Sequence, residues 1–220
     1  MPVLSVVEES NTKYAPSYIP TAIFVGGTSG IGRAMAEAFA AQTKGHANII
    51  LIGRNKAPAD EIIAGFPTVP SDLGSTVKHE FVQCDASEMK NVYNTCQELL
   101  SRIDKINILV LSVGGVAFRR KDTAEGLDTS MVLRYYCRAK FITQLLPLLS
   151  KARTAGEDAR VLSILAAAKG RAVDLEDPGL QNWSSSRAMA TTGTYNDIMI
   201  KVRVFTFSNR SSWPSVHDAS

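Results

Sequence analysis

Short apolar segments alternate with amphipathic segments along most of this chain, and this alternation restricts the fold more than any other feature. The apolar segments lie at 22–25, 48–53, 76–85, 107–112 and 159–166. Apolar and polar residues do not alternate within them, which predicts strands buried on both faces. Helices are expected at 31–44, 57–66, 87–103 and 124–153, and from about Trp183 onward. The pattern predicts an α/β fold, a Rossmann-like doubly wound parallel sheet built from right-handed βαβ units.

The 220 residues are enough for one domain with a sizeable core, and no internal boundary is visible. We expect an N-terminal tail over 1–20, a nucleotide-binding domain over 21–201 and an atypical, disordered tail over 202–220. The segment "VRVFTF" within that last part has strand propensity, but no Gly or Pro separates it from the helix before it. The last thirteen residues are rich in Ser.

The composition excludes several functional classes. A net charge of +3 is too small to indicate a nucleic-acid or membrane-surface partner, and the apolar segments are too short to span a bilayer. The three cysteines lack metal-type spacing and suit a reducing compartment, and the N-terminus does not read as a signal peptide. We therefore expect a cytoplasmic protein without a metal site.

A glycine cluster, "VGGTSGIGR" (25–33), joins the first strand to the first helix. A doubly wound sheet binds ligands at this junction. Small residues here let the backbone approach a pyrophosphate, while the helix N-terminus presents unpaired N–H groups to it. Glycine clusters also serve as ordinary tight turns, so the pattern alone is weak. The candidate cofactor residues are Gly26, Thr28, Ser29, Gly30, Ile31 and Gly32.

Residues at three further strand ends extend this predicted site. Arg54, followed by Asn55, stands where an acidic residue would bind a ribose 2′-hydroxyl, so NADP is the expected cofactor; Arg33 could assist. Asp85 could accept a hydrogen bond from an adenine amino group, and Gly114 allows close packing against a cofactor. Taken singly, Arg54 could be a solvated charge and Asp85 a helix N-cap.

With these residues in place, the chain resembles the short-chain dehydrogenase/reductase superfamily, and its fungal-type members in particular. "VGGTSGIG" is similar to the family's TGxxxGIG, with Val25 in place of Thr. "CDAS" matches the motif of its adenine-site Asp, and "NILVLSVGG" resembles its NNAG region, with Leu111 and Ser112 replacing the two Asn. The resemblance covers about residues 20–200. It implies hydride transfer between NADP(H) and a carbonyl or alcohol carbon.

The catalytic set that the resemblance implies is missing. The family's YxxxK falls on "WSSSR", so Trp183 stands for the Tyr and Arg187 for the Lys. The family's Ser falls on Ala166 or Ala167, and no Asn lies within 133–137. Tyr195 is expected to be a packing residue and Ser163 a hydrogen-bonded hydroxyl. Tyr135 and Tyr136 are the remaining candidate phenols, and Arg187 could still hold a ribose or phosphate.

The family pattern stops near Val202, before the sixth strand, the Pro-Gly turn and the substrate-covering helix that the resemblance implies. Val202 and Arg203 can be encoded by GTACGT, a common form of fungal splice donor. We therefore hypothesise that the tail is translated from a retained intron, which the genomic codons would test.

Two kinds of function stay open. The first is an NADP-dependent oxidoreductase that interconverts a ketone and an alcohol on a small-molecule substrate, such as an intermediate of fungal secondary metabolism. The second is a catalytically inactive NADP-binding pseudoenzyme, or a defective gene product. By analogy with the family, a homodimer through the helices at 124–153 and 183–200 is expected.

Overall fold

Five parallel strands form one sheet in the order β3-β2-β1-β4-β5. The structure is a computed structural model that describes residues 3–69, 77–115, 118–165 and 170–208, with the backbone alone for 202–208. The strands are rich in branched aliphatic residues, which favour extended backbone. They are β1 (Thr21–Val25), β2 (Asn48–Gly53), β3 (His79–Gln83), β4 (Ile108–Leu111) and β5 (Arg160–Ser163). This order confirms the predicted Rossmann-like doubly wound sheet, whose carboxyl ends share one edge.

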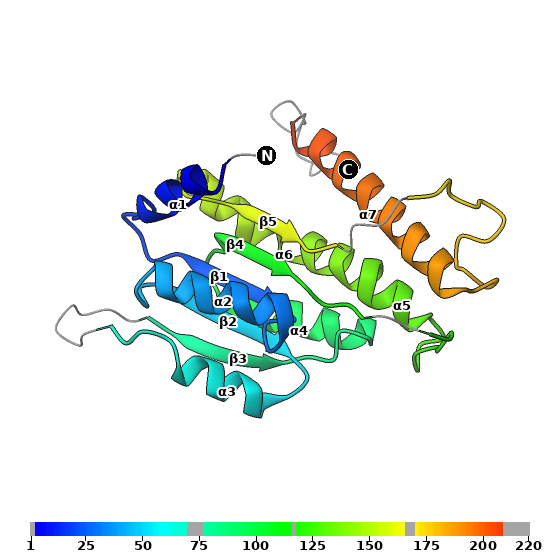
Figure 1. The fold of residues 1–220 in the computed structure, drawn as a ribbon, viewed down its shortest axis with the longest axis horizontal. Helices are drawn as coiled ribbons and strands as arrows, with labels where there is room; N and C mark the ends of the chain where they lie inside the picture. Colours follow the sequence, from blue (N-terminus) through cyan, green and yellow to red (C-terminus); the bar gives the residue numbers. More distant parts are fainter. Residues whose placement is uncertain (1–2, 70–76, 116–117, 166–169, 209–220) are drawn as a thin grey trace, which may run out of the picture.

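Helices connect the strands and cover both faces of the sheet (Figure 1). Their bounds are α1 (Leu4–Thr12), α2 (Gly30–Gln42), α3 (Lys56–Ala64), α4 (Met89–Arg102), α5 (Thr129–Met131), α6 (Cys137–Thr154) and α7 (Ser185–Ser208). A π-helical turn, η2 (Val132–Tyr136), joins α5 to α6. No helix within the described residues is long and apolar enough to cross a membrane.

Two hydrophobic cores lie on opposite faces of the sheet. On one face, Ile23 and Val25 of β1 pack with α4 and α6 through Leu99 and Phe141. On the other face, the intervening Phe24 packs with α2 and α3, whose buried residues include Ala36, Ala40 and Ile62. Successive side chains of a strand point to opposite faces, so the apolar runs of β1, β2 and β4 fill both cores. The expectation that the run at 159–166 is buried on both faces is wrong, because β5 is largely exposed. These cores fix the carboxyl ends of β1, β2 and β4 beside the start of α2.

The long helix expected at 124–153 begins five residues later than expected. Gly126 has a φ of +76°, which ends any continuous helix there. Asp128 then caps α5, because its carboxylate accepts a hydrogen bond from the backbone N–H of Met131 at 2.9 Å. The start of this helix is therefore set by a turn and a cap.

Both terminal segments contain helices that the sequence did not predict. The expected N-terminal tail includes α1, none of whose residues is buried. At the other end, the backbone of 202–208 continues α7, so the strand propensity of "VRVFTF" does not produce a strand. Adding a turn to an existing helix needs no new nucleus, which favours this outcome where no breaker intervenes. Residues 209–220 lie outside the described residues.

Candidate dinucleotide-binding site

A cavity of about 630 Å³ opens at the carboxyl ends of β1, β2, β3 and β4. This is the edge where open α/β sheets bind ligands. Nine of the ten predicted cofactor residues line it: Gly26, Thr28, Ser29, Gly30, Ile31, Gly32, Arg54, Asp85 and Gly114. The tenth, Asn55, does not line the cavity and is the N-cap residue of α3.

Gly30 and Gly32, at the junction of β1 and α2, have different structural roles. A Cβ on Gly32 would lie 2.4 Å from the backbone oxygen of Gly26 and 2.2 Å from Oγ of Ser112. Gly32 therefore lets α2 pack directly against the end of β1. A Cβ on Gly30, whose φ is +55°, would meet no protein atom within 4 Å. Because Gly30 lines the cavity, this open space is available to a ligand.

Hydrogen-bond donors at the start of α2 are available to an anion. Ser29 is the N-cap residue, but its side chain forms no capping hydrogen bond. The first N–H groups of a helix have no partner within it, and the helix dipole favours negative charge there. The hydroxyls of Thr28 and Ser29 also border the cavity. A pyrophosphate therefore fits this corner.

The two arginines considered for the cofactor differ in their surroundings. The exposed Arg54 lines the cavity and forms no ion pair with a carboxylate of the described residues. Arg33 does not line the cavity, and its Nε donates to Glu37 at 2.8 Å. Arg54 is therefore the better placed to pair with a 2′-phosphate, because its guanidinium remains available.

The two carboxylate oxygens of Asp85 have different surroundings. Its Oδ1 accepts from the backbone N–H of Ser87 at 3.0 Å and from the Ser87 hydroxyl at 2.7 Å. The N-cap position of α4 belongs to Glu88, so Asp85 stabilises the turn that precedes the helix. Oδ2 has no hydrogen-bond partner among the described residues and can accept a hydrogen bond from an amino group.

A smaller cavity of about 290 Å³ adjoins the first and shares Ile31, Ser112 and Gly114 with it. Arg134 and Arg138 border it from η2 and α6, and Asn196 borders it from α7. Arg138 is 3% exposed and donates to carbonyl oxygens at the ends of β4 and β5, those of Leu111 at 3.1 Å and Ile164 at 2.7 Å. It also donates to the Ser163 hydroxyl at 2.6 Å, as expected of a hydrogen-bonded Ser163.

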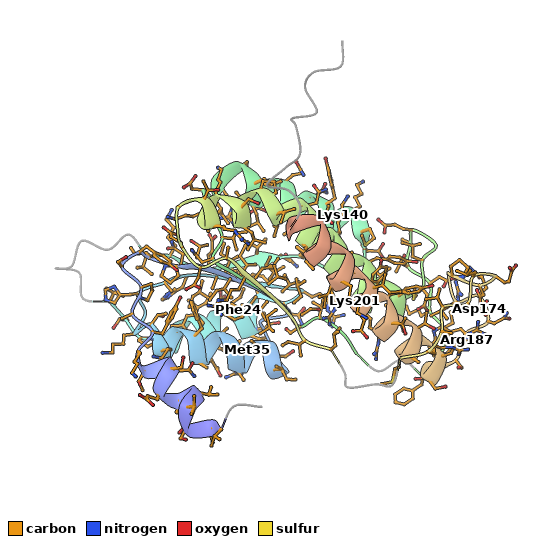
Figure 2. The ribbon with its side chains drawn as sticks, turned by 90° about the horizontal axis from the view of Figure 1, so that it is seen from above. Phe24, Met35, Lys140, Asp174, Arg187 and Lys201 are labelled. Carbon is orange, nitrogen blue, oxygen red and sulfur yellow. The ribbon has the colours of Figure 1, made fainter. Side chains whose placement is uncertain are left out.

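The two residues at the YxxxK positions lie outside both cavities. Trp183 packs against the small cluster of Met131, Leu180 and Ala188. Arg187 pairs with Asp174 at 2.6 Å and with Asp177 at 3.3 Å, at the start of α7 (Figure 2). Arg187 therefore anchors the segment before α7 and is not free to hold a ribose. The third position, Ala166 or Ala167, lies outside the described residues.

None of the candidate phenols borders either cavity. The ring of Tyr135 lies 5.3 Å from the rings of both Tyr136 and Tyr195. Tyr195 donates to the backbone oxygen of Pro178 at 2.9 Å, which is consistent with the expected packing role. Burial raises the pKa of Tyr136 and that of Tyr195, so neither is activated as a base. Neither of the remaining candidate phenols, Tyr135 and Tyr136, lines the two cavities.

Replacing Asp177 by asparagine should reduce the acid sensitivity of the protein. Hydrogen bonds from the backbone N–H groups of Asn182 and Gln181, and then the charge of Arg187, lower the pKa of Asp177. A lowered folded-state pKa stabilises the fold above the unfolded value, about 4, and this stabilisation is lost as the pH falls through the folded-state value. Urea midpoints measured from about pH 6 to pH 3 should therefore fall less steeply for Asp177→Asn than for the unmodified chain.

The matched control for this experiment is Asp60→Asn, which removes the carboxylate of an exposed i,i+4 pair with Lys56. Such surface pairs contribute little, so the pH profile should match that of the unmodified chain. Identical profiles for Asp177→Asn and Asp60→Asn would contradict a stabilising role for Asp177.

The fold and the glycine-lined cavity are typical of dinucleotide-binding α/β proteins. Residues 20–171 match the family described as short chain dehydrogenase, and the chain belongs to this family. The chain is 32% identical over 193 residues to "Oxidoreductase andH" of Emericella variicolor, which covers 87% of this chain and 54% of that protein. It is 34% identical over 183 residues to "NmrA-like family domain-containing oxidoreductase notO" of Aspergillus sp., covering 79% and 52%. The chain thus spans about half the length of these relatives.

Solved structures share the same fold. A short-chain dehydrogenase from Sphingobium yanoikuyae in complex with NADPH has a TM-score of 0.60 and 20% identity, over 86% of this chain and 66% of that one. A protein from Mycobacterium paratuberculosis gives a TM-score of 0.68 at 16% identity, over 90% and 67%.

Arg134, Arg138 and Asn196 were not predicted from the sequence to line a cavity. One signal was present: neither arginine has an acidic residue three or four positions away, although the two are four positions apart. Like charges at this spacing are unfavourable on a solvated helix, unless another interaction holds them. The signal does not indicate which way the side chains point, which the π-helical turn determines.

Proposed function

We propose that the chain binds NADP(H) in the larger cavity and acts as an oxidoreductase that interconverts a ketone and an alcohol on a small molecule. The observation that carries the proposal is the unpaired Arg54 at the end of β2, in a cavity whose glycines leave room for a pyrophosphate. Bound NADP(H) would supply or accept the hydride. A structural neighbour of the chain that was solved in complex with NADPH and the fungal oxidoreductase relatives support this proposal. We include in the proposal that the small molecule is an intermediate of secondary metabolism.

Different residues of the chain would bind different parts of NADP(H). The N–H groups at the start of α2 would hold the pyrophosphate, with Thr28 and Ser29 donating beside them. Arg54 would pair with the 2′-phosphate, and Asp85 would accept from the adenine amino group through Oδ2. Gly114 would leave room for the nicotinamide ring, which would lie toward the smaller cavity. Cytoplasmic location and a homodimer are part of the same proposal.

A second candidate function is NADP(H) binding without turnover. It is favoured by the absence of any Tyr among the described residues that line the two cavities, and by the pairing of Arg187 with Asp174 and Asp177. A phenol and a nearby ammonium group are what the family's proton transfer uses. Among the described residues that line the two cavities, Lys121 supplies an ammonium group, but no phenol accompanies it.

Titration of NADPH and NADH by fluorescence tests the cofactor, and the matched variant is Arg54→Asp. The unmodified chain should bind NADPH more tightly, and Arg54→Asp should bind NADH more tightly, because a carboxylate repels a 2′-phosphate and accepts from a 2′-hydroxyl. We expect a change in preference of about 100-fold, equivalent to about 2.7 kcal/mol. Because Arg33 already pairs with Glu37, Arg33→Asp should change the preference for NADPH over NADH much less. An unchanged preference in Arg54→Asp would remove Arg54 from the site.

Oxidation of NADPH with a panel of ketones then separates the two candidates. Turnover above the background rate supports the oxidoreductase. Tight NADPH binding with no turnover on any ketone supports the second function, and failure to bind either nucleotide contradicts both.

A further inference from the structure

We propose that the smaller cavity binds a small carboxylic acid that carries a hydroxyl group, with Arg134 holding the carboxylate and Asn196 accepting from the hydroxyl. The inference rests on the proposed function in one respect: the acid would be the substrate placed beside NADP(H). The residues that carry it are distinct from those that line the corner for the pyrophosphate.

The positive charge of this cavity is not neutralised by the described part of the chain. Arg134 and Arg138 line the cavity, and no Asp or Glu does. Neither guanidinium forms an ion pair with a carboxylate of the described residues. Burial lowers the pKa of both arginines, as expected for cations removed from water without an anionic partner. Buried charges are normally paired, so the geometry favours an anionic ligand.

The two arginines differ in how far the protein already uses their hydrogen-bonding groups. Arg138 directs Nη1 to two carbonyl oxygens and the Ser163 hydroxyl, and Nη2 to the carbonyl oxygen of Val113. It therefore serves as a fixed charge in the cavity wall. Arg134 donates through Nη2 to the carbonyl oxygen of Gly115, and this bond orients the guanidinium. Its Nε and Nη1 have no acceptor among the described residues and can donate to a carboxylate.

Asn196 supplies an unused acceptor in the same cavity. The residue is 1% exposed, and its Nδ2 donates to the carbonyl oxygens of Arg134 at 2.8 Å and Thr192 at 2.7 Å. Two carbonyl partners fix the orientation of the amide, because only the NH₂ group can donate to them. Its Oδ1 is buried and has no hydrogen-bond partner. An unsatisfied buried acceptor is costly, and a hydroxyl of the ligand would satisfy it.

The size of the cavity limits the ligand. A volume of about 290 Å³ lies at the lower end of the range for small-molecule sites. Met189 and Gly193 of α7 and Leu165 complete a partly apolar wall, which suits a short carbon chain between the two polar groups. The matching chemical class is a short hydroxy acid.

Three probes that differ in one group each test this inference: 3-hydroxybutyrate, butyrate, which lacks the hydroxyl, and 3-hydroxybutyramide, which lacks the charge. Binding is measured by ligand-observed NMR with the full chain, up to about 20 mM, a range that detects millimolar dissociation constants. We expect 3-hydroxybutyrate to bind at least about tenfold more tightly than either analogue, since each lacks one partner. Similar binding of the acid and the amide, or no binding of any probe, would overturn the proposal.

Variants assign the binding to this cavity. Arg134→Gln should weaken 3-hydroxybutyrate binding about tenfold or more while leaving NADPH binding unchanged, and Arg134→Lys should restore part of the affinity. Asn196→Leu should remove the preference for 3-hydroxybutyrate over butyrate. Circular dichroism checks that each variant is folded. Wild-type affinity for the acid in folded Arg134→Gln would overturn the proposal.

Two further experiments distinguish failure of this inference from failure of the proposed function. Arg54→Asp should change nucleotide binding but not acid binding, and saturating NADPH should leave the acid bound. Loss of acid binding in saturating NADPH would show that the cofactor's own phosphates occupy the arginines, which overturns the inference alone. Acid binding that persists in a chain that binds no nucleotide would overturn the proposed function alone.

Discussion

Replacing Gly30 by alanine should weaken NADPH binding by at least about tenfold while the chain remains folded. Gly30 lines the larger cavity, and a Cβ built on it meets no protein atom within 4 Å. The added methyl group would therefore occupy the space through which the pyrophosphate approaches the start of α2. A fluorescence titration with NADPH measures the loss, and urea unfolding measures stability.

Gly156→Ala is the matched control for Gly30→Ala. Gly156 has a φ of +76° and equally open surroundings, but it follows α6 and does not line the cavity. A residue other than glycine in this conformation costs about 1–2 kcal/mol, so both variants should lose a similar amount of stability. Only Gly30→Ala should lose NADPH affinity. Equal NADPH binding by the two variants would contradict the placement of the pyrophosphate beside Gly30.

Replacing Gly32 by alanine should instead destabilise the whole domain, by about 3 kcal/mol or more. The new Cβ would lie 2.4 Å from the Gly26 backbone oxygen and 2.2 Å from the Ser112 hydroxyl, so α2 would have to move away from the sheet. NADPH binding would be lost as a consequence of this movement. The urea midpoint, compared with that of the unmodified chain, measures the effect.

Two comparisons test the cause of this destabilisation. Gly193→Ala places a methyl group in α7 where nothing lies within 4 Å, so it should be neutral or stabilising by up to about 1 kcal/mol. Adding Ser112→Ala to Gly32→Ala removes one of the two clashes and should restore only part of the stability, because the backbone oxygen of Gly26 remains. Full recovery would show that Ser112 alone makes a residue larger than glycine unfavourable at 32.

The fold could be predicted from the sequence because each strand is an apolar run long enough to be recognised without its neighbours. The runs at 22–25 and 48–53 lie within β1 and β2, and the glycine cluster between β1 and α2 follows from local turn chemistry. The ends of helices and strands were predicted less accurately than their positions along the chain. The start of the long helix is set by Gly126 and by the Asp128 cap. The apolar pattern typical of a helix continues on both sides of these two residues, so the sequence pattern alone places the start too early.

The convergence of the candidate cofactor residues on one cavity was predictable for the same reason. Strands of a parallel sheet end at one edge, so residues that follow them in the sequence converge in space. Arg54 and Asp85 line one cavity although they lie on different strand ends. Asn55 follows Arg54 directly and yet lies outside the cavity, because the chain turns into α3 there.

The second half of the site depends on side-chain direction, which the sequence does not specify. Trp183 and Arg187 were placed at the Tyr and Lys positions of the site only by the resemblance of "WSSSR" to the family's YxxxK. Packing with Leu180 and pairing with Asp174 and Asp177 direct them away from both cavities. Arg134 and Arg138 reach the smaller cavity through a π-helical turn, whose extra residue changes the angular relation between side chains on either side of it.

The strand β5 has a consequence for how the protein behaves in concentrated solution. Within the described residues β5 pairs only with β4, and its Val161 and Leu162 are 41% and 47% exposed. Unpaired backbone groups beside exposed apolar side chains are the usual starting point for strand addition between molecules. Strand addition at β5 is therefore a route by which copies of the chain can associate in concentrated solution, and a lysine introduced at Val161 or Leu162 should reduce this association.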